Sequence, residues 1–363
     1  MNVLLSSLKL RFSSVRAGAL ALTAFAALTA PAGALTVVIN PGATLAANTD
    51  ALAAFNRAGA QWGALINDPI TVTISANFAS LGANILGSTS SVSLAASYTS
   101  IRNAMVADNL TGALNTLTSA LPTAAQFSAF VPTGSTISGN MTATKANLKA
   151  LGFTGLDAGF GATDATMTFS TNFGFDFDNS NGVSAGLVDF ETVAVHEIGH
   201  ALGFVSGVDN LDGGATTLSM RPLDLFRFGN AANPNTLSDF TFFARDFVPG
   251  AATFFDQITP ITGTVAQYGF STGANLGDGR QASHWKDDAL TGAYIGIMDP
   301  TLGSGTVKQI TRADLVALDV IGWNINYATA PVPEAASPLT LGMAALFLVG
   351  LARSQRVGQR RRG

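Results

Sequence analysis

The chain has 363 residues, of which 47% are hydrophobic and only 12% charged, whereas about a quarter of the residues in typical soluble domains are charged. It contains no cysteine and three histidines, so disulfides, thiolate metal sites and cysteine nucleophiles are excluded. Any chemistry that needs an imidazole must use His196, His200 or His284. The length fits one large domain or two modest ones.

The charge of the chain is unevenly distributed. Residues 1–34 carry three basic residues and residues 353–363 carry five, with no acidic residue in either segment. The body between them, 35–352, has 11 basic residues against 23 acidic ones. Because nucleic-acid binding needs a basic surface, no nucleic-acid partner is expected. The apolar stretches inside the body are shorter than the roughly 18 residues that a membrane-spanning helix needs, so we expect the body to be soluble.

The N-terminal segment has the organisation of an export signal. Basic residues end at Arg16, an apolar run covers 17–30, and a proline and an Ala-Gly-Ala sequence follow. A basic start, a short apolar run and small residues at a cleavage site are typical of a Sec signal peptide. We therefore predict a signal peptide over 1–34, cleaved after Ala34. A buried N-terminal helix is the alternative.

The next part, residues 35–330, is expected to form the folded domain. In chain order, the apolar patterns predict a strand at 35–39, a helix at 45–66, a strand at 70–74, helices at 98–106 and 145–151, and a strand at 166–175. After about residue 205 no long stretch shows the apolar periodicity of a helix or strand until the final helix of the domain. Thr311 caps that helix, and Asp314 completes a capping box. The fold class is therefore α+β. A mixed sheet and the histidine-bearing helix would form an N-terminal subdomain to about 204, and a loop-rich C-terminal subdomain over 205–330 would end in the closing helix.

The sequence His196-Glu-Ile-Gly-His200 carries the clearest chemistry. Asp189 is a good N-cap for a helix that runs through both histidines and ends at Gly203. Two histidines four residues apart lie on one helix face, where both can bind one Zn²⁺ at about 2.0–2.1 Å. Glu197 lies near the same face and can take a proton from a water molecule, as in metalloproteases. A structural helix with two incidental histidines is the alternative.

The third metal ligand must come from outside this helix. Catalytic zinc sites have three protein ligands and one open position. His284 is the remaining imidazole in the chain. Asp209 and Asp212, soon after the helix, are the alternatives.

Residues 186–323 resemble the leishmanolysin-like metallopeptidases, a family of metzincins. Metzincins usually place a third His three residues after the glycine that ends the helix, whereas this chain has Ser206 there. The leishmanolysin-like family carries an insertion at that point, with the third His in an Ala/Ser-His-Trp context and a Leu/Ile-Met-x-Pro turn after it. This chain has Ser-His-Trp at 283–285 and Ile-Met-Asp-Pro at 297–300.

The resemblance implies a metzincin fold and a secreted zinc endopeptidase acting on protein or peptide substrates. By resemblance, His196, His200 and His284 bind Zn²⁺, Glu197 is the general base, and Met298 lies beneath the metal without binding it. The disulfides of the family are absent here, so the core and the metal must hold the fold. A matrix or surface protein with a non-catalytic zinc site is the alternative function.

The C-terminal segment, 331–363, has three parts. A stiff Pro-Val-Pro-Glu linker is followed by an apolar run over 339–352 and a cluster of arginines. This end resembles the PEP-CTERM sorting signal of Gram-negative bacteria, although the usual Val-Pro-Glu-Pro reads Val-Pro-Glu-Ala here. The resemblance implies an exosortase-like processing partner, a transient stay in the inner membrane with the arginines cytoplasmic, and delivery outside the cell or to its surface. A simple tail anchor is the alternative.

Three weaker patterns concern the rest of the domain. Asp176 to Gly182 has the composition of a calcium loop without its spacing, so a turn rich in Asx residues is expected. Asp278 and the pair at 287–288 are candidates to orient the His284 imidazole, with plain surface charge as the alternative. A group of phenylalanines is expected to pack in the core: Phe226, Phe228, Phe240, Phe242, Phe243, Phe254 and Phe255.

Overall fold

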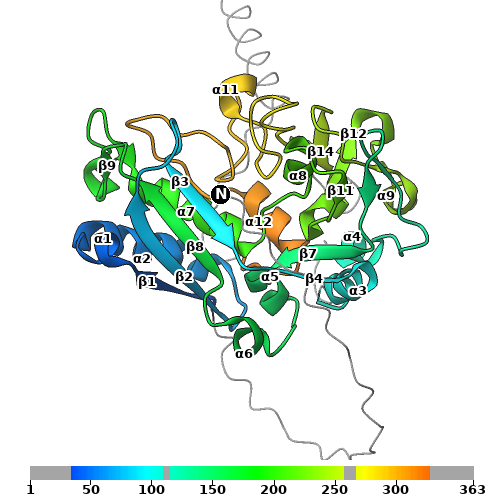
Figure 1. The fold of residues 1–363 in the computed structure, drawn as a ribbon, viewed down its shortest axis with the longest axis horizontal. Coiled ribbons are helices and arrows are strands. Elements are labelled where there is room, and N and C mark those ends of the chain that lie inside the picture. Colours follow the sequence, from blue (N-terminus) through cyan, green and yellow to red (C-terminus); the bar gives the residue numbers. More distant parts are fainter. Residues whose placement is uncertain (1–33, 109–114, 257–266, 328–363) are drawn as a thin grey trace, which may run out of the picture. The chain divides into compact units, whose positions relative to one another are not determined.

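The computed structural model describes residues 34–108, 115–256 and 267–327 (Figure 1). The predicted signal peptide and sorting tail therefore lie outside the described residues, apart from Ala34. The described part contains both helices and several sheets, in agreement with the predicted α+β class. Within it, no helix is both long and apolar enough to cross a membrane.

A four-stranded sheet forms the first part of the fold. Its strands are, in spatial order, β1 (Thr36–Pro41), β2 (Thr71–Ala79), β8 (Ala165–Ser170) and β3 (Gly87–Ser91). The first three strands are parallel and β3 is antiparallel to β8, with Thr89 opposite Met167. Strand β3 is therefore the outermost strand on one side of the sheet.

Two helices, α2 (Thr49–Leu65) and α7 (Phe190–Leu202), cover one face of this sheet. Phe55 of α2 and Phe190 of α7 both pack against Phe169 of β8, with ring centroids 5.1 and 4.6 Å apart. Burying side chains of this size stabilises the fold by about 1.5–3 kcal/mol each. The indole of Trp62 donates a hydrogen bond of 3.0 Å to the Val195 carbonyl and joins the helices directly.

A five-stranded sheet forms much of the second part. Its order is β15 (Gln267–Gly269), β14 (Thr253–Asp256), β12 (Arg227–Gly229), β13 (Arg245–Asp246) and β5 (Ala129–Phe130). The prediction of a loop-rich second half missed this sheet, because strands of two to four residues show no alternating pattern in the sequence. Strand β5 comes from the first half of the chain and links the two parts.

The remaining short strands form three pairs: β4 (Ser93–Ser97) with β7 (Asn140–Thr144), β6 (Thr136–Ile137) with β11 (Thr217–Leu218), and β9 (Phe175–Asp176) with β10 (Val188–Asp189). The remaining helices in the described residues are α1 (Ala43–Ala46), α3 (Tyr98–Asp108), α4 (Asn115–Ser119), α5 (Lys145–Ala150), α6 (Leu156–Phe160), α8 (Val208–Asp212), α9 (Leu237–Phe242), α11 (Asp288–Thr291) and α12 (Arg312–Asp319), with 3₁₀ turns η1 (Asn179–Asn181), η2 (Pro222–Phe226) and η3 (Asn230–Ala232). The predicted helices at 98–106 and 145–151 are confirmed as α3 and α5.

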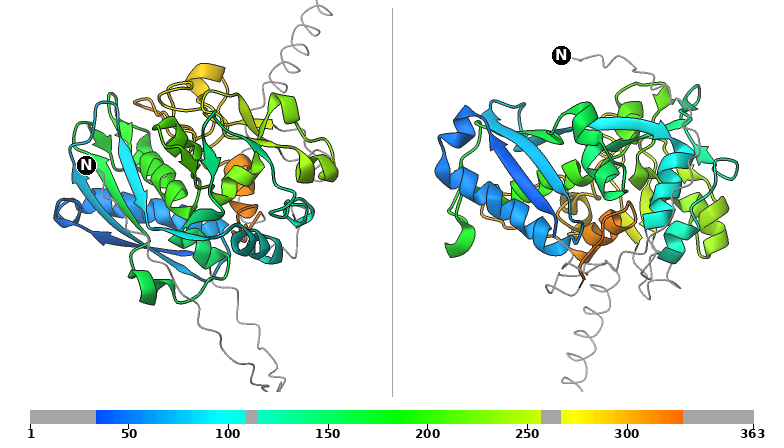
Figure 2. Two further views of the ribbon diagram at one scale, coloured as in Figure 1. Left: turned by 45° about the vertical axis from the view of Figure 1, so that its right-hand side comes forward. Right: turned by 90° about the horizontal axis from the view of Figure 1, so that it is seen from below.

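Two predicted elements are divided in the structure. The helix expected over 45–66 is α1 followed by α2, because the Asn48 side chain accepts from the Ala51 N–H and starts a new helix. The strand expected over 166–175 is β8 and the short β9. The closing helix is confirmed as α12, with the predicted cap and capping box. In Figure 2, α12 (orange) lies beside the end of α2 (blue), where Asn67 N–H donates to the Asn324 carbonyl.

Most of the phenylalanine group packs as predicted. Phe226, Phe228, Phe240 and Phe255 are fully buried, whereas Phe254 and Phe243 are partly buried. The prediction is wrong for Phe242, which is 57% exposed. Phe240 and Phe242 are two residues apart on the six-residue helix α9, so they point to different sides of it.

Candidate metal centre

Helix α7 begins and ends as the sequence predicts. The Asp189 carboxylate accepts a 2.9 Å hydrogen bond from the Thr192 N–H and caps the first turn. Gly203 ends the helix with φ of 120°, a conformation that favours glycine. His196 and His200 therefore lie one turn apart on one face of a helix that is fixed at both ends.

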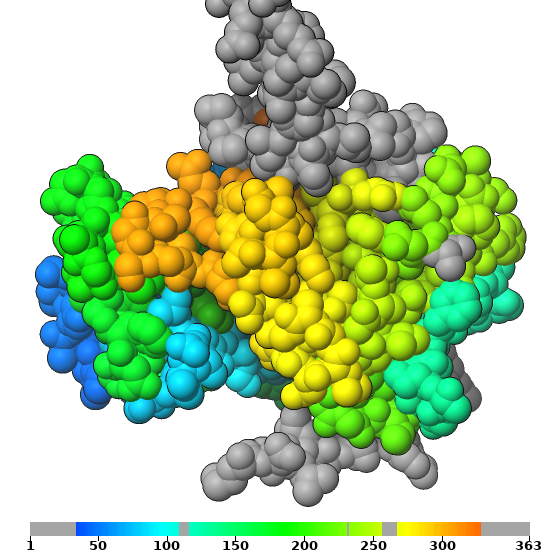
Figure 3. All heavy atoms as spheres, turned by 90° about the horizontal axis from the view of Figure 1, so that it is seen from above, coloured from blue at the N-terminus to red at the C-terminus, as the bar shows by residue number. Residues whose placement is uncertain are grey.

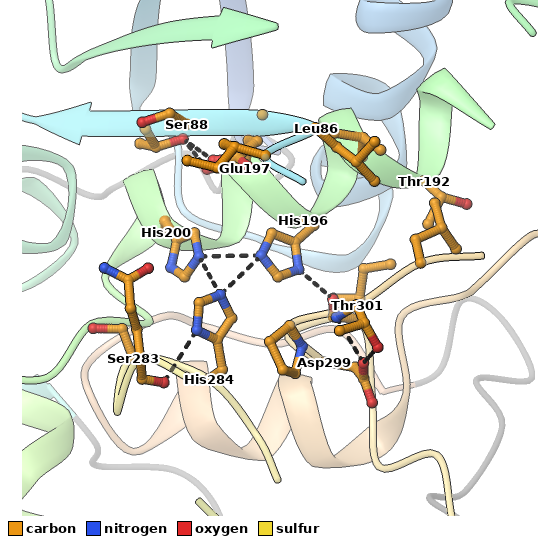
Figure 4. Close-up of a pocket in the computed structure, with 18 of the residues that line it drawn as sticks. Leu86, Ser88, Thr192, His196, Glu197, His200, Ser283, His284, Asp299 and Thr301 are labelled. Atoms are coloured by element: carbon orange, nitrogen blue, oxygen red, sulfur yellow. Dashed lines mark hydrogen bonds between the residues drawn. The ribbon is translucent and has the colours of Figure 1, made fainter. Parts of the chain in front are cut away.

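The structure brings His284 to these two histidines. The three Nε2 atoms form a triangle with sides of 3.1, 3.2 and 3.3 Å (Figure 4). His284 comes from a loop after β15, and its neighbour Trp285 donates a backbone hydrogen bond to the Met298 carbonyl. Within the described residues, these histidines form a group that could hold a metal ion.

The second ring nitrogen of each histidine faces a backbone carbonyl. The oxygens are those of Ile297, Phe204 and Gln281, at 2.7 Å from His196, 2.8 Å from His200 and 3.2 Å from His284. A carbonyl oxygen only accepts hydrogen bonds, so each Nδ1 carries the proton and each Nε2 presents a lone pair. Three converging lone pairs cannot bond one another, whereas a cation between them satisfies all three.

The protonation state and spacing of the three histidines also fit a metal ion. Burial, with a smaller contribution from a neighbouring histidine, lowers the pKa of each imidazole to about 3. The rings are therefore uncharged near neutral pH, as metal ligands must be. Nitrogens bound at about 2.0–2.1 Å to a tetrahedral zinc ion lie roughly 3.3–3.4 Å apart, close to the observed triangle.

The two alternative ligands lie elsewhere and bind protein groups. The Asp209 carboxylate accepts from the backbone N–H groups of Ala282 and Ser283 and from the Ser283 hydroxyl. Asp212 accepts from the N–H groups of Asn275 and Leu276. Asp209 therefore holds the segment that carries His284.

Ser206, at the position of the usual metzincin third histidine, has a different role. Its hydroxyl donates a 2.6 Å hydrogen bond to the buried carboxylate of Asp224. Its backbone N–H donates to the Ser283 hydroxyl at 2.8 Å. The end of α7 is thus tied to the His284 segment through hydrogen bonds.

The side chain of Glu197 projects from α7 towards β3, the strand that carries Ser88 (Figure 4). The Thr89 hydroxyl of β3 donates to its Oε2 at 2.6 Å. Burial raises the pKa of the Glu197 carboxyl to about 7, and the Thr89 hydrogen bond opposes this shift. Its carboxylate also packs against the Cα of Gly87, where an added Cβ would lie 2.7 Å from Oε1.

Met298 packs against α7 at Gly199. An added Cβ at Gly199 would clash with its sulfur, so the two residues are in close contact. The buried Asp314 carboxylate at the start of α12 holds this turn: it accepts from the N–H groups of Ile297 and Met298, at 2.8 and 3.3 Å, and from the Trp285 indole at 2.8 Å. Helix α12 therefore supports both the Met298 turn and the His284 segment.

The acidic residues near His284 do not contact its imidazole. Asp278 pairs with Lys286 at 2.6 Å and Asp287 with Arg280 at 2.7 Å. Asp287, Asp288 and Asp299 form a second cluster of carboxylates. Hydrogen bonds and cations already engage them: Lys308 pairs with Asp288 and Asp299, at 2.7 and 3.2 Å.

The predicted Asx-rich turn is confirmed. Asp176 accepts from the N–H groups of Asp178 and Ser184, and Asp178 accepts from that of Ser180. Backbone groups therefore occupy the oxygens that a calcium loop would offer.

The three histidines and Glu197 line one cleft of about 790 Å³. One side of the cleft is formed by β3 and the loop before it, and the other by the segments around His284 and Pro300. In Figure 3 the cyan residues around β3 and the yellow residues of the His284 segment lie next to one another.

Neither Thr89 nor the role of Asp314 in the site could be predicted from local sequence patterns. Strand β3 reads Gly-Ser-Thr-Ser-Ser, which lacks the apolar alternation that marks a strand. Asp314 was predicted as a helix cap, and its bonds to Ile297, Met298 and Trp285 depend on tertiary contacts.

Comparison with known proteins gave no match to any family model, curated protein or solved structure.

Proposed function

We propose that this chain is a zinc-dependent endopeptidase of the metzincin type, with Zn²⁺ held by His196, His200 and His284. The convergence of three unprotonated Nε2 atoms within 3.3 Å carries the proposal. In the described part of the chain, this group contains three metal-ligating residues and no fourth. Three protein ligands with an open position are typical of catalytic zinc, whereas structural zinc has four protein ligands.

Glu197 is the proposed general base. A bound zinc ion supplies a Lewis acid that polarises a carbonyl and makes water more acidic. Glu197, with its pKa raised to about 7 by burial, can accept a proton from the attacking water and pass it to the departing amine near neutral pH. Thr89 and Gly87 hold its carboxylate between α7 and β3.

Strand β3 provides a surface for an extended peptide. It pairs with β8 along one edge and lines the cleft with Gly87, Ser88 and Thr89. Unpaired backbone groups at a sheet edge bind peptides as an added strand. Since antiparallel pairing is slightly more stable than parallel pairing, we propose that the substrate runs antiparallel to β3.

The remaining features fit a secreted metzincin that resembles the leishmanolysin-like family. We propose that the sheet, α2 and α7 form the N-terminal subdomain of such a fold, and that the Met298 turn and α12 belong to the C-terminal one. We propose that residues 1–34 direct export and that residues 331–363 engage an exosortase-like system at the membrane of a Gram-negative cell.

The Glu197→Gln variant tests this function. It should keep the zinc stoichiometry of the wild type and lose cleavage of unfolded casein by about 10²–10⁴-fold. Glu191→Gln is the matched control, because Glu191 is on the same helix but pairs with Arg57 outside the cleft. Cleavage by Glu197→Gln at the wild-type rate would overturn the role of Glu197. Zinc binding with no chelator-sensitive cleavage of any peptide by the wild type would favour a non-catalytic zinc site.

A further inference from the structure

Two cationic side chains from the described residues line the cleft, and they differ in their partners. The Lys308 ammonium contacts Asp288 Oδ2 at 2.7 Å, Asp299 Oδ1 at 3.2 Å and the Thr301 carbonyl at 3.0 Å. The Nε and Nη1 atoms of Arg221 are buried and have no hydrogen-bonding partner among the described residues. Lys308 is therefore neutralised, and Arg221 has donors to offer.

Leaving these donors unpaired costs stability. A buried donor without an acceptor loses the hydrogen bonds that it makes with water in the unfolded chain, and the cost is greater when the donor is charged. An arginine cannot escape the cost by losing its proton. By contrast, two other buried arginines each donate through two nitrogens to backbone carbonyls and keep a single unpaired nitrogen: Arg227 bonds Ala282 and Ser271, and Arg245 bonds Leu225 and Phe243.

The backbone of Arg221 is held in place even though two nitrogens of its guanidinium have no partner among the described residues. Its N–H donates a 2.7 Å hydrogen bond to the buried Asp224 carboxylate. That carboxylate also accepts from the Ser206 hydroxyl and the Gly207 N–H, at 2.6 and 2.9 Å. Asp224 thus fixes the position of Arg221 with oxygens that are already engaged by other donors.

These contacts also place Arg221 along the cleft. Ser206 joins Asp224 to Ser283, and Figure 4 shows Ser283 at one end of the histidine triangle, with Thr192 and Thr301 at the other. Lys308 belongs to this second end, because its N–H donates to the Thr192 hydroxyl. The unpaired and the neutralised cation therefore lie towards opposite ends.

We propose that Arg221 binds a carboxylate of the substrate and determines specificity, an inference that rests on the proposed peptidase function. A guanidinium binds a carboxylate through two parallel hydrogen bonds, from Nε and Nη2 or from Nη1 and Nη2, so either arrangement would satisfy one of the two buried donors. In Figure 4, β3 runs from Leu86 at the Thr192 end to Ser88 at the Ser283 end. A peptide antiparallel to β3 then has its N-terminal part near Arg221. The carboxylate is thus an Asp or Glu side chain on the N-terminal side of the cleaved bond.

Paired peptides test the inference. Each pair carries Glu or Gln at one of the three positions before the cleaved bond, and each peptide is made with a free and an amidated C-terminus. The wild type should cleave one Glu peptide with a kcat/KM at least tenfold above its Gln partner. Arg221→Gln should abolish this preference, and Arg221→Lys should restore part of it. Arg57→Gln, a change of an arginine outside the cleft, should leave the preference intact.

A binding measurement separates this inference from the proposed function. Fluorescence anisotropy measures how tightly the same peptides bind. The Glu197→Gln variant should bind the Glu peptide at least tenfold more tightly than its Gln partner. The double variant Glu197→Gln/Arg221→Gln should bind both peptides equally. Cleavage with equal rates for Glu and Gln peptides, unchanged by Arg221→Gln, would overturn the carboxylate role and leave the peptidase function standing. Binding of the Glu peptide that depends on Arg221, without cleavage of any peptide, would support the carboxylate role and overturn the peptidase function. The absence of both Arg221-dependent binding and cleavage would overturn the two proposals together.

The C-terminal arm distinguishes the source of the carboxylate. A preference for a free over an amidated C-terminus that disappears in Arg221→Gln would support carboxylate binding with the peptide in the opposite direction. It would overturn the assignment to an acidic side chain.

Discussion

The two sides of the histidine triangle are built in different ways. His196, Glu197 and His200 share one helix, so their relative positions follow from the helical repeat. His284 lies on an irregular segment that is held by hydrogen bonds to Asp209 and by the contact of Trp285 with Asp314. Local helix geometry thus positions two of the imidazoles, whereas a network of buried carboxylates positions the third.

The largest effect should come from removing the third imidazole. His284→Ala should abolish tight zinc binding, because two histidines alone do not complete the three-ligand set. Zinc content after dialysis against a chelator measures this. Asp209→Ala should retain zinc with about 10–100-fold weaker affinity, since Asp209 supports the segment without joining the triangle. Full zinc content in His284→Ala with loss in Asp209→Ala would make Asp209 the ligand.

The second effect concerns Asp314, whose carboxylate supports the segment that carries His284. Asp314→Asn removes an acceptor from a buried group that binds Ile297, Met298 and the Trp285 indole. We expect the free energy of unfolding to fall by roughly 3 kcal/mol, with weaker zinc binding. Asp239→Asn changes the capping box of the helix α9 and should cost about 1 kcal/mol. Equal urea midpoints for the two variants would contradict the supporting role of Asp314.

The third effect concerns helix α7, which carries Glu197. Gly87→Ala should displace the Glu197 carboxylate, because the new Cβ would lie 2.7 Å from Oε1. A misplacement of about 1 Å can cost roughly 10²-fold in rate, so kcat should fall on this scale while zinc content stays unchanged. Gly139→Ala is the control, since an added Cβ there meets no atom within 4 Å. An unchanged kcat in Gly87→Ala would show that Glu197 is not held by β3.

The smallest effect is a change in the pH dependence of folding stability that leaves zinc affinity unchanged. Near the C-terminal end of α12, burial, together with the charges of Asp68 and Asp319, raises the pKa of Asp108 from 3.8 to about 7. Between these values the folded state holds a proton that the unfolded state has released, so this group's contribution to stability falls as the pH rises from about 4 to about 7 and is constant above that.

Asp108→Asn should therefore unfold at higher urea than the wild type at pH 8 and at the same urea at pH 3.5. Zinc affinity should not change, because Asp108 contacts no residue of the triangle. A variant that is less stable than the wild type at pH 8 would contradict the shift.

The same contrast explains how much the sequence could predict. The caps of α7 and α12 and the spacing of His196, Glu197 and His200 are local patterns, and the structure has α7 and α12 where they were expected. His284 was reached by elimination and resemblance, and the structure places it with the other two. The role of Asp209 in holding the His284 segment, the Thr89 bond to Glu197 and the unpaired Arg221 depend on tertiary packing. No periodic or cap signal marks them, because β3 and the turn before η2 have no apolar pattern.

Diffraction from crystals of the zinc-loaded protein, recorded at the zinc absorption edge, would show which residues bind the metal. We predict one strong anomalous peak at about 2.0–2.1 Å from the Nε2 atoms of His196, His200 and His284, with no carboxylate of Asp209 or Asp212 within bonding distance. A peak bound by either aspartate, or one that leaves His284 free, would contradict it.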